Sequence, residues 1–179
     1  MNRFLLGAVA GAFVLASCSG KSEYVAEYAP MDSVPFNIET NVEANSYLVH
    51  NYPNVVMFRV EYPQYNAVVK YGMVHSADSA RLMKAYVGQL NRMGDRVFYS
   101  YYQQDTVSGP GVRGWIFTSL PDKTPLQMIV TDSATMMLHG KLEFTVQQTD
   151  TAGVIKPAVE AITADMEHMV RNLELRIEN

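Results

Sequence analysis

VVMFRVEYPQYNAVVKYGMV, residues 55–74, is the stretch around which the rest of the chain has to assemble. In its two halves, 55–62 and 67–74, apolar side chains alternate with charged ones such as Arg59 and Lys70. Alternation with a period of two is typical of strands that bury one face. The connection between the halves contains a proline and an asparagine, which favour a tight turn. The stretch therefore predicts an antiparallel β-hairpin.

The same pattern recurs on both sides of this hairpin. Further strands are expected at residues 47–50, 97–102, 112–119, 126–131 and 136–146. Residues 103–111 contain Ser-Gly-Pro-Gly and are expected to form a loop. Gly140 interrupts the apolar face of the last strand, which indicates a bulge or a helix-packing site. Because most connections have hairpin length, we expect a largely antiparallel sheet.

Two amphipathic helices complete the expected fold. The first has Ser76 as its expected N-cap, and Gly94 is expected to end it. The second carries an apolar stripe from Ile155 to Ile177, with Pro157 in its first turn. This order of elements predicts an α+β fold: a largely antiparallel sheet covered by two main helices, the second long and C-terminal.

The N-terminus indicates an exported protein. Arg3 precedes an apolar run of about thirteen residues, which suits a secretory leader and falls short of the roughly 20 that span a bilayer. Leu15-Ala16-Ser17-Cys18 looks like a bacterial lipobox, so we expect cleavage before Cys18 and lipidation of its sulfur, with acyl chains such as palmitate. The alternative is an ordinary secretory peptide that happens to end near a cysteine.

These signals divide the chain into three parts. Residues 1–17 are the expected signal peptide, 18–45 a lipidated tether interrupted by prolines, and 46–179 a single α+β domain. The net charge is −4, and no basic run or stripe occurs, which argues against nucleic-acid binding. We expect a lipid-anchored cell-envelope protein on the inner or outer membrane, with its domain facing the periplasm.

No catalytic or metal site is predicted. The histidines lie at positions 50, 75, 139 and 168, and none pairs with another at metal-ligand spacing. Asp165 and His168 are expected to be a solvated pair on the surface of the last helix. We expect no cofactor and no metal, although the scattered carboxylates leave enzymatic activity open.

One glycine motif has to be weighed against nucleotide binding. Gly109, Gly111 and Gly114 have the spacing G-x-G-x-x-G, which in a dinucleotide site follows a strand and opens a helix. Here Pro110 lies inside the motif, and a strand is expected to follow it. Phosphate binding is therefore not favoured.

Aromatic side chains offer a better candidate site. Alternation places Tyr99 and Tyr101 on one strand face and Phe98 and Tyr102 on the other, and Trp115 follows on the next expected strand. A single layer of helix cannot bury both faces, so these five residues are the candidate contact patch for a partner protein. The alternatives are a sheet covered on both faces, or a small-molecule pocket near residues 98–111.

Several stretches of the chain resemble the gliding-motility lipoprotein GldD family of the bacterial envelope. The resemblance is carried by Tyr62–Ala67 with the strand to Tyr71, Pro125–Ser133, Leu138–Phe144, Ile155-Lys156-Pro157 and Asp165–His168. It implies a non-enzymatic accessory protein, associated in gliding bacteria with motility and secretion machinery, and it assigns no catalytic residue. Relatives also occur in bacteria that do not glide. The order of elements is loosely similar to the Mog1/PsbP-like sandwich, a fold of accessory and binding modules.

Overall fold

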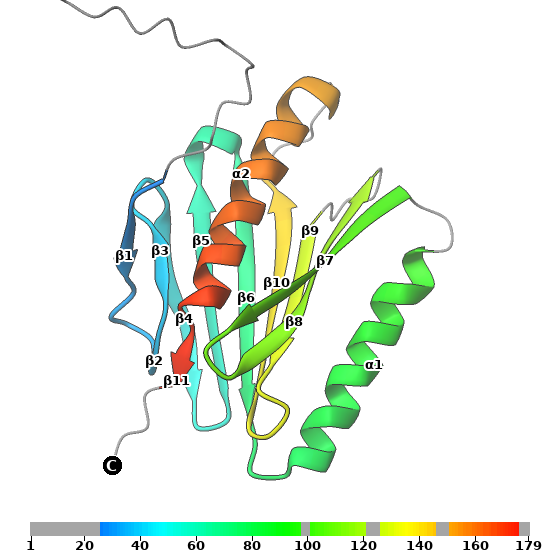
Figure 1. Cartoon of the computed structure of the whole chain (residues 1–179). Coiled ribbons are helices and arrows are strands. Elements are labelled where there is room, and N and C mark those ends of the chain that lie inside the picture. The colour runs from blue at the N-terminus through cyan, green and yellow to red at the C-terminus, as the bar shows by residue number, and fades with distance from the viewer. Residues whose placement is uncertain (1–25, 98–100, 121–125, 146–150, 176–179) are drawn as a thin grey trace, which may run out of the picture.

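The computed structural model describes residues 26–97, 101–120, 126–145 and 151–175. Its centre is a seven-stranded sheet in which every neighbouring pair of strands is antiparallel (Figure 1). Across the sheet the order is β4 (Asn45–Tyr52), β5 (Val55–Tyr62), β6 (Ala67–His75), β10 (Met136–Phe144), β9 (Leu126–Thr131), β8 (Val112–Leu120) and β7 (Tyr101–Gly109). The α+β class expected from the sequence is confirmed.

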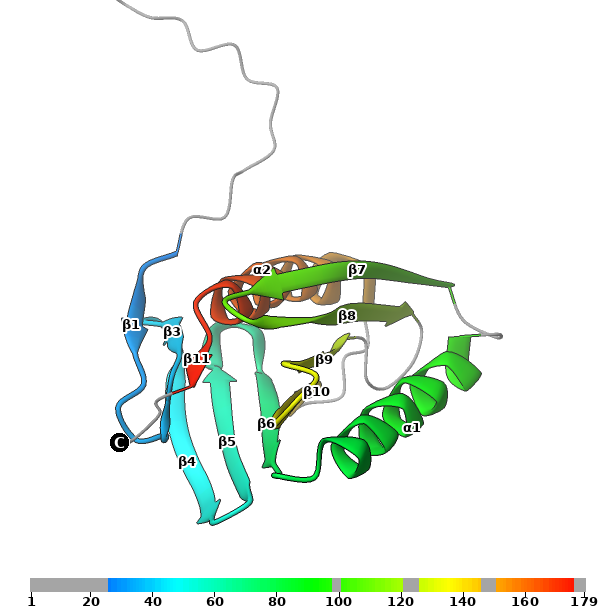
Figure 2. The same ribbon diagram turned by 60° about the horizontal axis from the view of Figure 1, so that its bottom comes forward.

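Two helices lie on opposite faces of this sheet (Figure 2). One face is packed against α2 (Thr151–Arg171), and the other is partly covered by α1 (Ser79–Val97). Two short ribbons lie on the α2 side (Figure 1). They pair β1 (Tyr28–Pro30) with β3 (Glu39–Asn41), and β2 (Phe36–Asn37) with β11 (Glu174–Leu175).

The expected hairpin at 55–74 is present and supplies the centre of the main core. Phe58 pairs with Tyr71 across β5 and β6, and their rings stack with centroids 4.7 Å apart. The connection is a short 3-10 helix, η1 (Pro63–Tyr65), closed by Asn66 at φ 49°. Apolar side chains from the sheet and α2 fill the space between them, among them Val60, Val69, Met128, Leu138, Leu142, Ile162, Met166 and Val170.

The domain begins earlier than the expected boundary at residue 45. Residues 28–41 form the ribbons on the α2 side, and Met31, Val34, Phe36 and Ile38 are at most 5% exposed. Short ribbons tolerate prolines at strand ends, which is why Pro30 does not exclude a strand here. These residues belong to the folded domain, and lipidation of Cys18 ahead of them stays a prediction.

The limits of α1 differ from those expected. Asp78, not Ser76, caps the helix, because its Oδ1 accepts a hydrogen bond from the N–H of Arg81 at 3.0 Å. Ser76 Oγ instead accepts from the N–H of Asp78, two residues later, in the connection before the helix. The helix continues through Gly94 to Val97. A glycine costs a helix only about 1 kcal/mol, which is too little to end it where packing continues.

Residues 97–109 are the largest error in the expected secondary structure. Of the strand expected at 97–102, Val97 ends α1, residues 98–100 lie outside the described residues, and Tyr101 and Tyr102 begin a strand. That strand, β7, continues to Gly109 and replaces most of the loop expected at 103–111. Pro110 and Gly111 make the turn into β8, with Gly111 at φ 70°. β7 is an edge strand rich in polar residues, so it lacks the apolar alternation that identified the other strands.

The C-terminal helix has the expected apolar stripe but different ends. α2 begins at Thr151, so Pro157 lies inside the helix and not in its first turn. It ends at Arg171, and Ile177 lies outside the described residues. Within the parts of the chain that the structure describes, no helix is both long and apolar enough to cross a membrane.

Candidate interaction surface

The sheet face opposite α2 is only partly covered. Leu82 and Tyr86 of α1 pack on Ile129 and Met137, over the β8–β10 side. Over β4–β6 the face is left uncovered, and its side chains are exposed, for example Met57 at 42%. We call this region the open face. It comprises the outward side chains Tyr47, His50, Tyr52, Val55, Met57, Arg59, Glu61, Lys70, Gly72, His139, Lys141 and Glu143, whereas Val74 packs against the apolar cluster under α1.

A row of three cations crosses the open face. The strand register places Arg59 opposite Lys70, and Lys70 opposite Lys141. Like charges directly opposite each other destabilise a sheet, so such a row needs compensating anions. Glu61 lies 3.0 Å from Arg59, and Glu143 accepts a hydrogen bond from Lys70 at 2.6 Å. Among these five side chains the formal charge is +1 (3 − 2).

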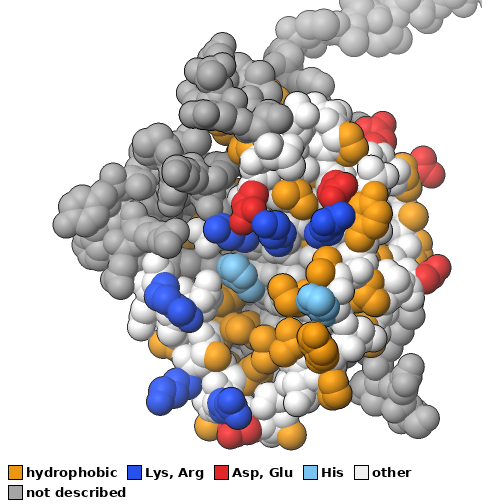
Figure 3. Space-filling view, turned by 180° about the vertical axis from the view of Figure 1, so that it is seen from behind, with side chains coloured by type: hydrophobic (Ala, Val, Ile, Leu, Met, Phe, Trp, Pro, Cys, Tyr) orange, Lys and Arg blue, Asp and Glu red, His pale blue; other side chains and the backbone are white. Residues whose placement is uncertain are grey.

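The two carboxylates only partly neutralise the row. Glu143 is shared, because it also lies 3.6 Å from the ammonium of Lys141. The hydrogen bond from Lys70 lowers the pKa of Glu143 and keeps it ionised. The guanidinium of Arg59 also lies over the ring of Tyr47, 5.0 Å from its centroid. Figure 3 shows the charged side chains as a band, with histidines and hydrophobic side chains beneath it.

Two residues along the strands from this row, the open face contains a hollow. Gly72 lies there between Met57 of β5 and His139 of β10. A Cβ built on Gly72 would have no atom within 4 Å, so the space above this residue is open. The hollow therefore has an apolar wall on one side and an imidazole on the other.

His139 lies where the open face meets α1. Its Nε2 is 3.5 Å from Nε2 of Gln89 on the helix. Burial, followed by the positive charges of Lys141 and Arg92, lowers the pKa of His139. The imidazole is therefore neutral near pH 7 and offers a hydrogen-bonding wall without adding to the positive charge.

The open face continues onto the edge strand β4. Tyr47 and Tyr52, whose strand partners Arg59 and Val55 belong to the open face, are 42% and 58% exposed. A register shift between Leu48 and His50 marks a bulge, which twists the edge and discourages pairing with another strand. The exposed side chains of β4 therefore add to the open face, and the backbone of β4 is poorly suited to pair with a further strand.

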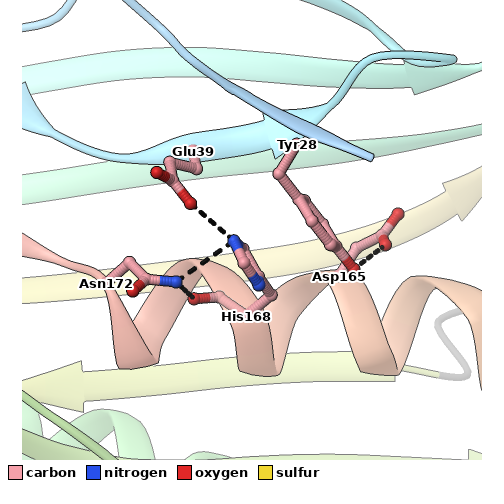
Figure 4. Close-up of polar contacts among 5 residues, drawn as sticks. All are labelled: Tyr28, Glu39, Asp165, His168 and Asn172. Carbon is pink, nitrogen blue, oxygen red and sulfur yellow. Dashed lines mark hydrogen bonds and ion pairs between the residues drawn. The ribbon is translucent and has the colours of Figure 1, made fainter. Parts of the chain in front are cut away.

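A second polar cluster lies on the opposite side of the molecule, between α2 and the ribbon formed by β1 and β3, which we call the N-terminal ribbon (Figure 4). The hydroxyl of Tyr28 donates to Oδ1 of Asp165 at 2.8 Å, and Nδ2 of Asn41 donates to Oδ2 at 3.0 Å. Asp165 is 3% exposed. Burial and the bond to this carboxylate raise the pKa of Tyr28. The carboxylate thus holds β1 and β3 onto the helix.

His168 extends the same cluster by one helical turn. Its ring stacks on Tyr28 with centroids 3.5 Å apart, and its Nε2 lies 2.6 Å from Oε2 of Glu39. The expected solvated pair of Asp165 and His168 is wrong, because each side chain binds the N-terminal ribbon instead. We call Tyr28, Glu39, Asn41, Asp165 and His168 the N-terminal clamp.

The predicted aromatic patch is mostly beyond what the structure describes. Cys18, Phe98 and Tyr99 lie outside the described residues. Tyr101 and Tyr102 lie on β7, but their side chains are not among those described. Trp115 is half-buried in the small core beneath α1, so it is mainly a packing residue.

The glycines of the G-x-G-x-x-G spacing serve close packing around the β7–β8 hairpin. A Cβ on Gly109 would lie 1.8 Å from the carbonyl oxygen of Val170, and one on Gly114 would lie 2.0 Å from that of Ile129. Gly111 supplies the positive φ of the turn. A strand follows, as expected, and not the helix that a dinucleotide site requires.

An open hollow of about 420 Å³ lies beside this hairpin, close to the expected small-molecule pocket. Its one carboxylate, that of Asp132, is already used by its own turn. Oδ1 accepts from the N–H groups of Ala134, Thr135 and Met136. Burial raises the pKa of Asp132, but these bonds and the Thr135 hydroxyl outweigh it and lower the pKa. The hollow is lined by Ser108, Gly109, Gly111, Val112, Arg113, Thr131, Asp132 and Ser133.

The histidines are dispersed, and within the described ranges no group of three metal-ligating side chains comes together. His50 and His139 share one row of the open face but are separated by Met57 and Gly72. His75 lies at the end of β6, and His168 belongs to the N-terminal clamp.

The open face was not identified from sequence as a site. Its charged members were recognised as solvent-facing, but only the register of β5, β6 and β10 puts Arg59, Lys70 and Lys141 in one row. The available signal was a charged residue on the outward side of each of three strands. No protein-family model matches this chain, and no curated protein matches it closely enough to count as a relative.

Proposed function

We propose that this chain is a lipid-anchored accessory protein of a bacterial cell envelope that acts through protein contacts and not by catalysis. The contact surface is the open face. The observation that carries the proposal is the uncovered sheet over β4–β6, where aromatic, apolar and charged side chains lie exposed together.

The composition of the open face suits a protein interface. Tyr47, Tyr52 and Met57 are each more than two-fifths exposed, and Arg59 lies beside them. Aromatic residues, Met and Arg are enriched at interface centres. Burying a fully exposed side chain of this kind contributes about 1.5–3 kcal/mol, so covering the exposed half or so of each of these three contributes roughly half as much.

The place where the chain enters the domain supports this choice of surface. The first described residue, Ala26, leads into β1 on the α2 side, opposite the open face. The proposed lipid on Cys18 lies eight residues earlier (26 − 18). Eight extended residues reach at most about 28 Å, so the anchor favours the α2 side towards the membrane. The open face then faces the aqueous compartment.

The resemblance to the GldD family narrows the setting of this function. It favours a role beside an envelope assembly, such as the motility or secretion machinery of relatives. The lipobox supports the same compartment, and the anchor itself has a direct test. Cys18→Ser should move the full chain from the membrane fraction to the soluble fraction; unchanged membrane association would contradict lipid anchoring.

Site-specific photo-crosslinking in native membranes tests the proposed surface. A photoreactive amino acid replaces Met57 on the open face, and a matched control replaces Glu160, which is exposed on α2. We expect discrete crosslinked proteins from position 57 that are absent from position 160. Identical patterns from both positions, or none from position 57 at native expression levels, would contradict the proposal.

A further inference from the structure

Charge is distributed unevenly over the two sides of the molecule. The open face carries +1, although the whole chain carries −4. Arg92 of α1 adds a further positive charge beside it, close enough to act on His139. Across β1–β3, α2 and β11, the solvent-facing charges of the described residues sum to −5 (2 − 7). They are Lys156 and Arg171 against Glu27, Asp32, Glu39, Glu43, Glu160, Glu167 and Glu174.

The cationic row has more hydrogen-bond donors than the open face can satisfy. Lys70 and Lys141 each carry three N–H donors, and both contact the same carboxylate, that of Glu143. Arg59 contacts Glu61 through Nε, so the outer edge of its guanidinium still points two N–H groups elsewhere. The side chain of Lys70 is 59% exposed. Carboxylates from a partner are well suited to accept hydrogen bonds from these remaining N–H donors.

The hollow over Gly72 lies at a spacing that one extended segment can match. Lys70 and Gly72 are two residues apart on β6, a separation of about 6.8 Å. An extended partner segment places its own side chains i and i+2 at the same distance. A carboxylate over Lys70 therefore puts the side chain two residues later over Gly72, where Met57 gives an apolar contact.

We propose that the open face binds an extended acidic segment of a partner protein, with a carboxylate on the Arg59–Lys70–Lys141 row and, two residues later, an apolar side chain in the hollow over Gly72. This inference rests on the proposed function, because it names the chemistry of the partner that the open face contacts. Burial of the apolar side chain supplies affinity, and the charge row supplies specificity and orientation.

Labelled synthetic peptides test the proposal with the full chain in nonionic detergent. The probe places Glu and Phe two residues apart between serines (Ser-Glu-Ser-Phe-Ser), and its matched controls replace Glu by Lys or Phe by Ser. By fluorescence anisotropy, the Glu–Phe peptide should bind about tenfold more tightly than the Lys–Phe peptide. Its affinity should fall as salt is added.

Three variants separate this site from the rest of the surface. Lys70→Glu with Lys141→Glu should reverse the preference between the Glu and Lys peptides, and Lys70→Gln with Lys141→Gln should abolish it. Gly72→Leu fills the hollow and should remove the advantage of Phe over Ser. Lys156→Glu with Arg171→Glu, on α2, should leave the affinities for all the peptides unchanged. Thermal unfolding of each variant verifies that the fold is retained.

Several outcomes would overturn the proposal. Equal binding of Glu and Lys peptides would do so, as would no measurable binding at the solubility limit. If Lys70→Glu with Lys141→Glu instead abolishes self-association, the occupant is a second copy. If it abolishes binding to phosphatidylglycerol vesicles without a peptide preference, the occupant is a membrane. Crosslinks from position 57 that persist in any of these cases would leave the proposed function standing with a partner of different chemistry.

Discussion

The two faces of the seven-stranded sheet differ in how much of each is covered by other elements. The α2 face is covered along its length, and Leu138, Leu142 and Val69 have no exposed surface. The other face is covered by α1 over the β8–β10 side and left uncovered over β4–β6. The strands are shared, so the difference lies in alternate residues of the same segments. Stability is therefore concentrated on one face, and the capacity for contact on the other.

The largest expected effect comes from truncating matched side chains on the two faces. Leu138→Ala leaves a cavity in the main core and should destabilise the protein by about 3 kcal/mol. Met57→Ala removes a side chain that is 42% exposed and should change stability by less than about 0.5 kcal/mol. Urea unfolding of the two variants measures both. Similar losses would mean that the open face is covered in the native protein.

Two glycines on neighbouring strands give a sharper comparison. A Cβ on Gly140 would lie 2.7 Å from the ring of Tyr71, which is buried and stacked on Phe58. Gly140→Ala should therefore cost about 2 kcal/mol through overpacking. Gly72→Ala meets no atom and should stabilise the strand by about 0.5 kcal/mol. In thermal unfolding, the midpoint should fall for Gly140→Ala and rise for Gly72→Ala. Two midpoints that move in the same direction would contradict the assignment of the faces.

The smallest expected effect is on the pH dependence of stability. It comes from His139, which lies between the open face and the part of the sheet that α1 covers. The pKa of His139 is lowered in the folded protein, whereas an unfolded histidine titrates near about 6.5. Below that pH the unfolded chain binds a proton more readily, so the free energy of unfolding falls on acidification. Between about pH 7 and about pH 5, His139→Gln should lose less stability than the unmodified chain.

A companion variant identifies the cause of this pH dependence. Lys141 contributes to the lowered pKa of His139 after burial. Lys141→Gln should raise that pKa in an NMR titration and reduce the dependence of stability on pH. A pKa unchanged by this substitution would show that burial and Arg92 set it without Lys141.

Elements that carry their own apolar alternation were predictable from the sequence. The hairpin at 55–74, the strand at 126–131 and the stripe of α2 each bury one face, and side-chain spacing is sufficient to identify them. Residues 103–109 of β7 were missed because these mostly polar residues obtain order from pairing with β8, a contact that their own pattern does not encode. The short strand β2 was missed for the same reason, since it pairs with β11 from the end of the chain.

The candidate site depended on information that no single segment holds. Alternation puts Arg59, Lys70 and Lys141 each on the polar face of its own strand, but β6 and β10 are far apart in the sequence and adjacent in the sheet. Asp165 was expected at the surface because a helical aspartate is normally solvated. Its buried position follows from Tyr28 and Asn41, which supply the hydrogen bonds that a buried carboxylate needs.

The N-terminal clamp also determines how the domain bears tension. The chain enters at β1, so a force that pulls on residues ahead of Ala26 acts first on the Tyr28–Asp165 hydrogen bond and on the three residue pairs between β1 and β3. These contacts open one after another, because an antiparallel ribbon pulled from its end separates pair by pair. The seven-stranded sheet carries load only afterwards. A chain anchored at Cys18, as proposed, would lengthen at that attachment while the proposed contact surface keeps its shape.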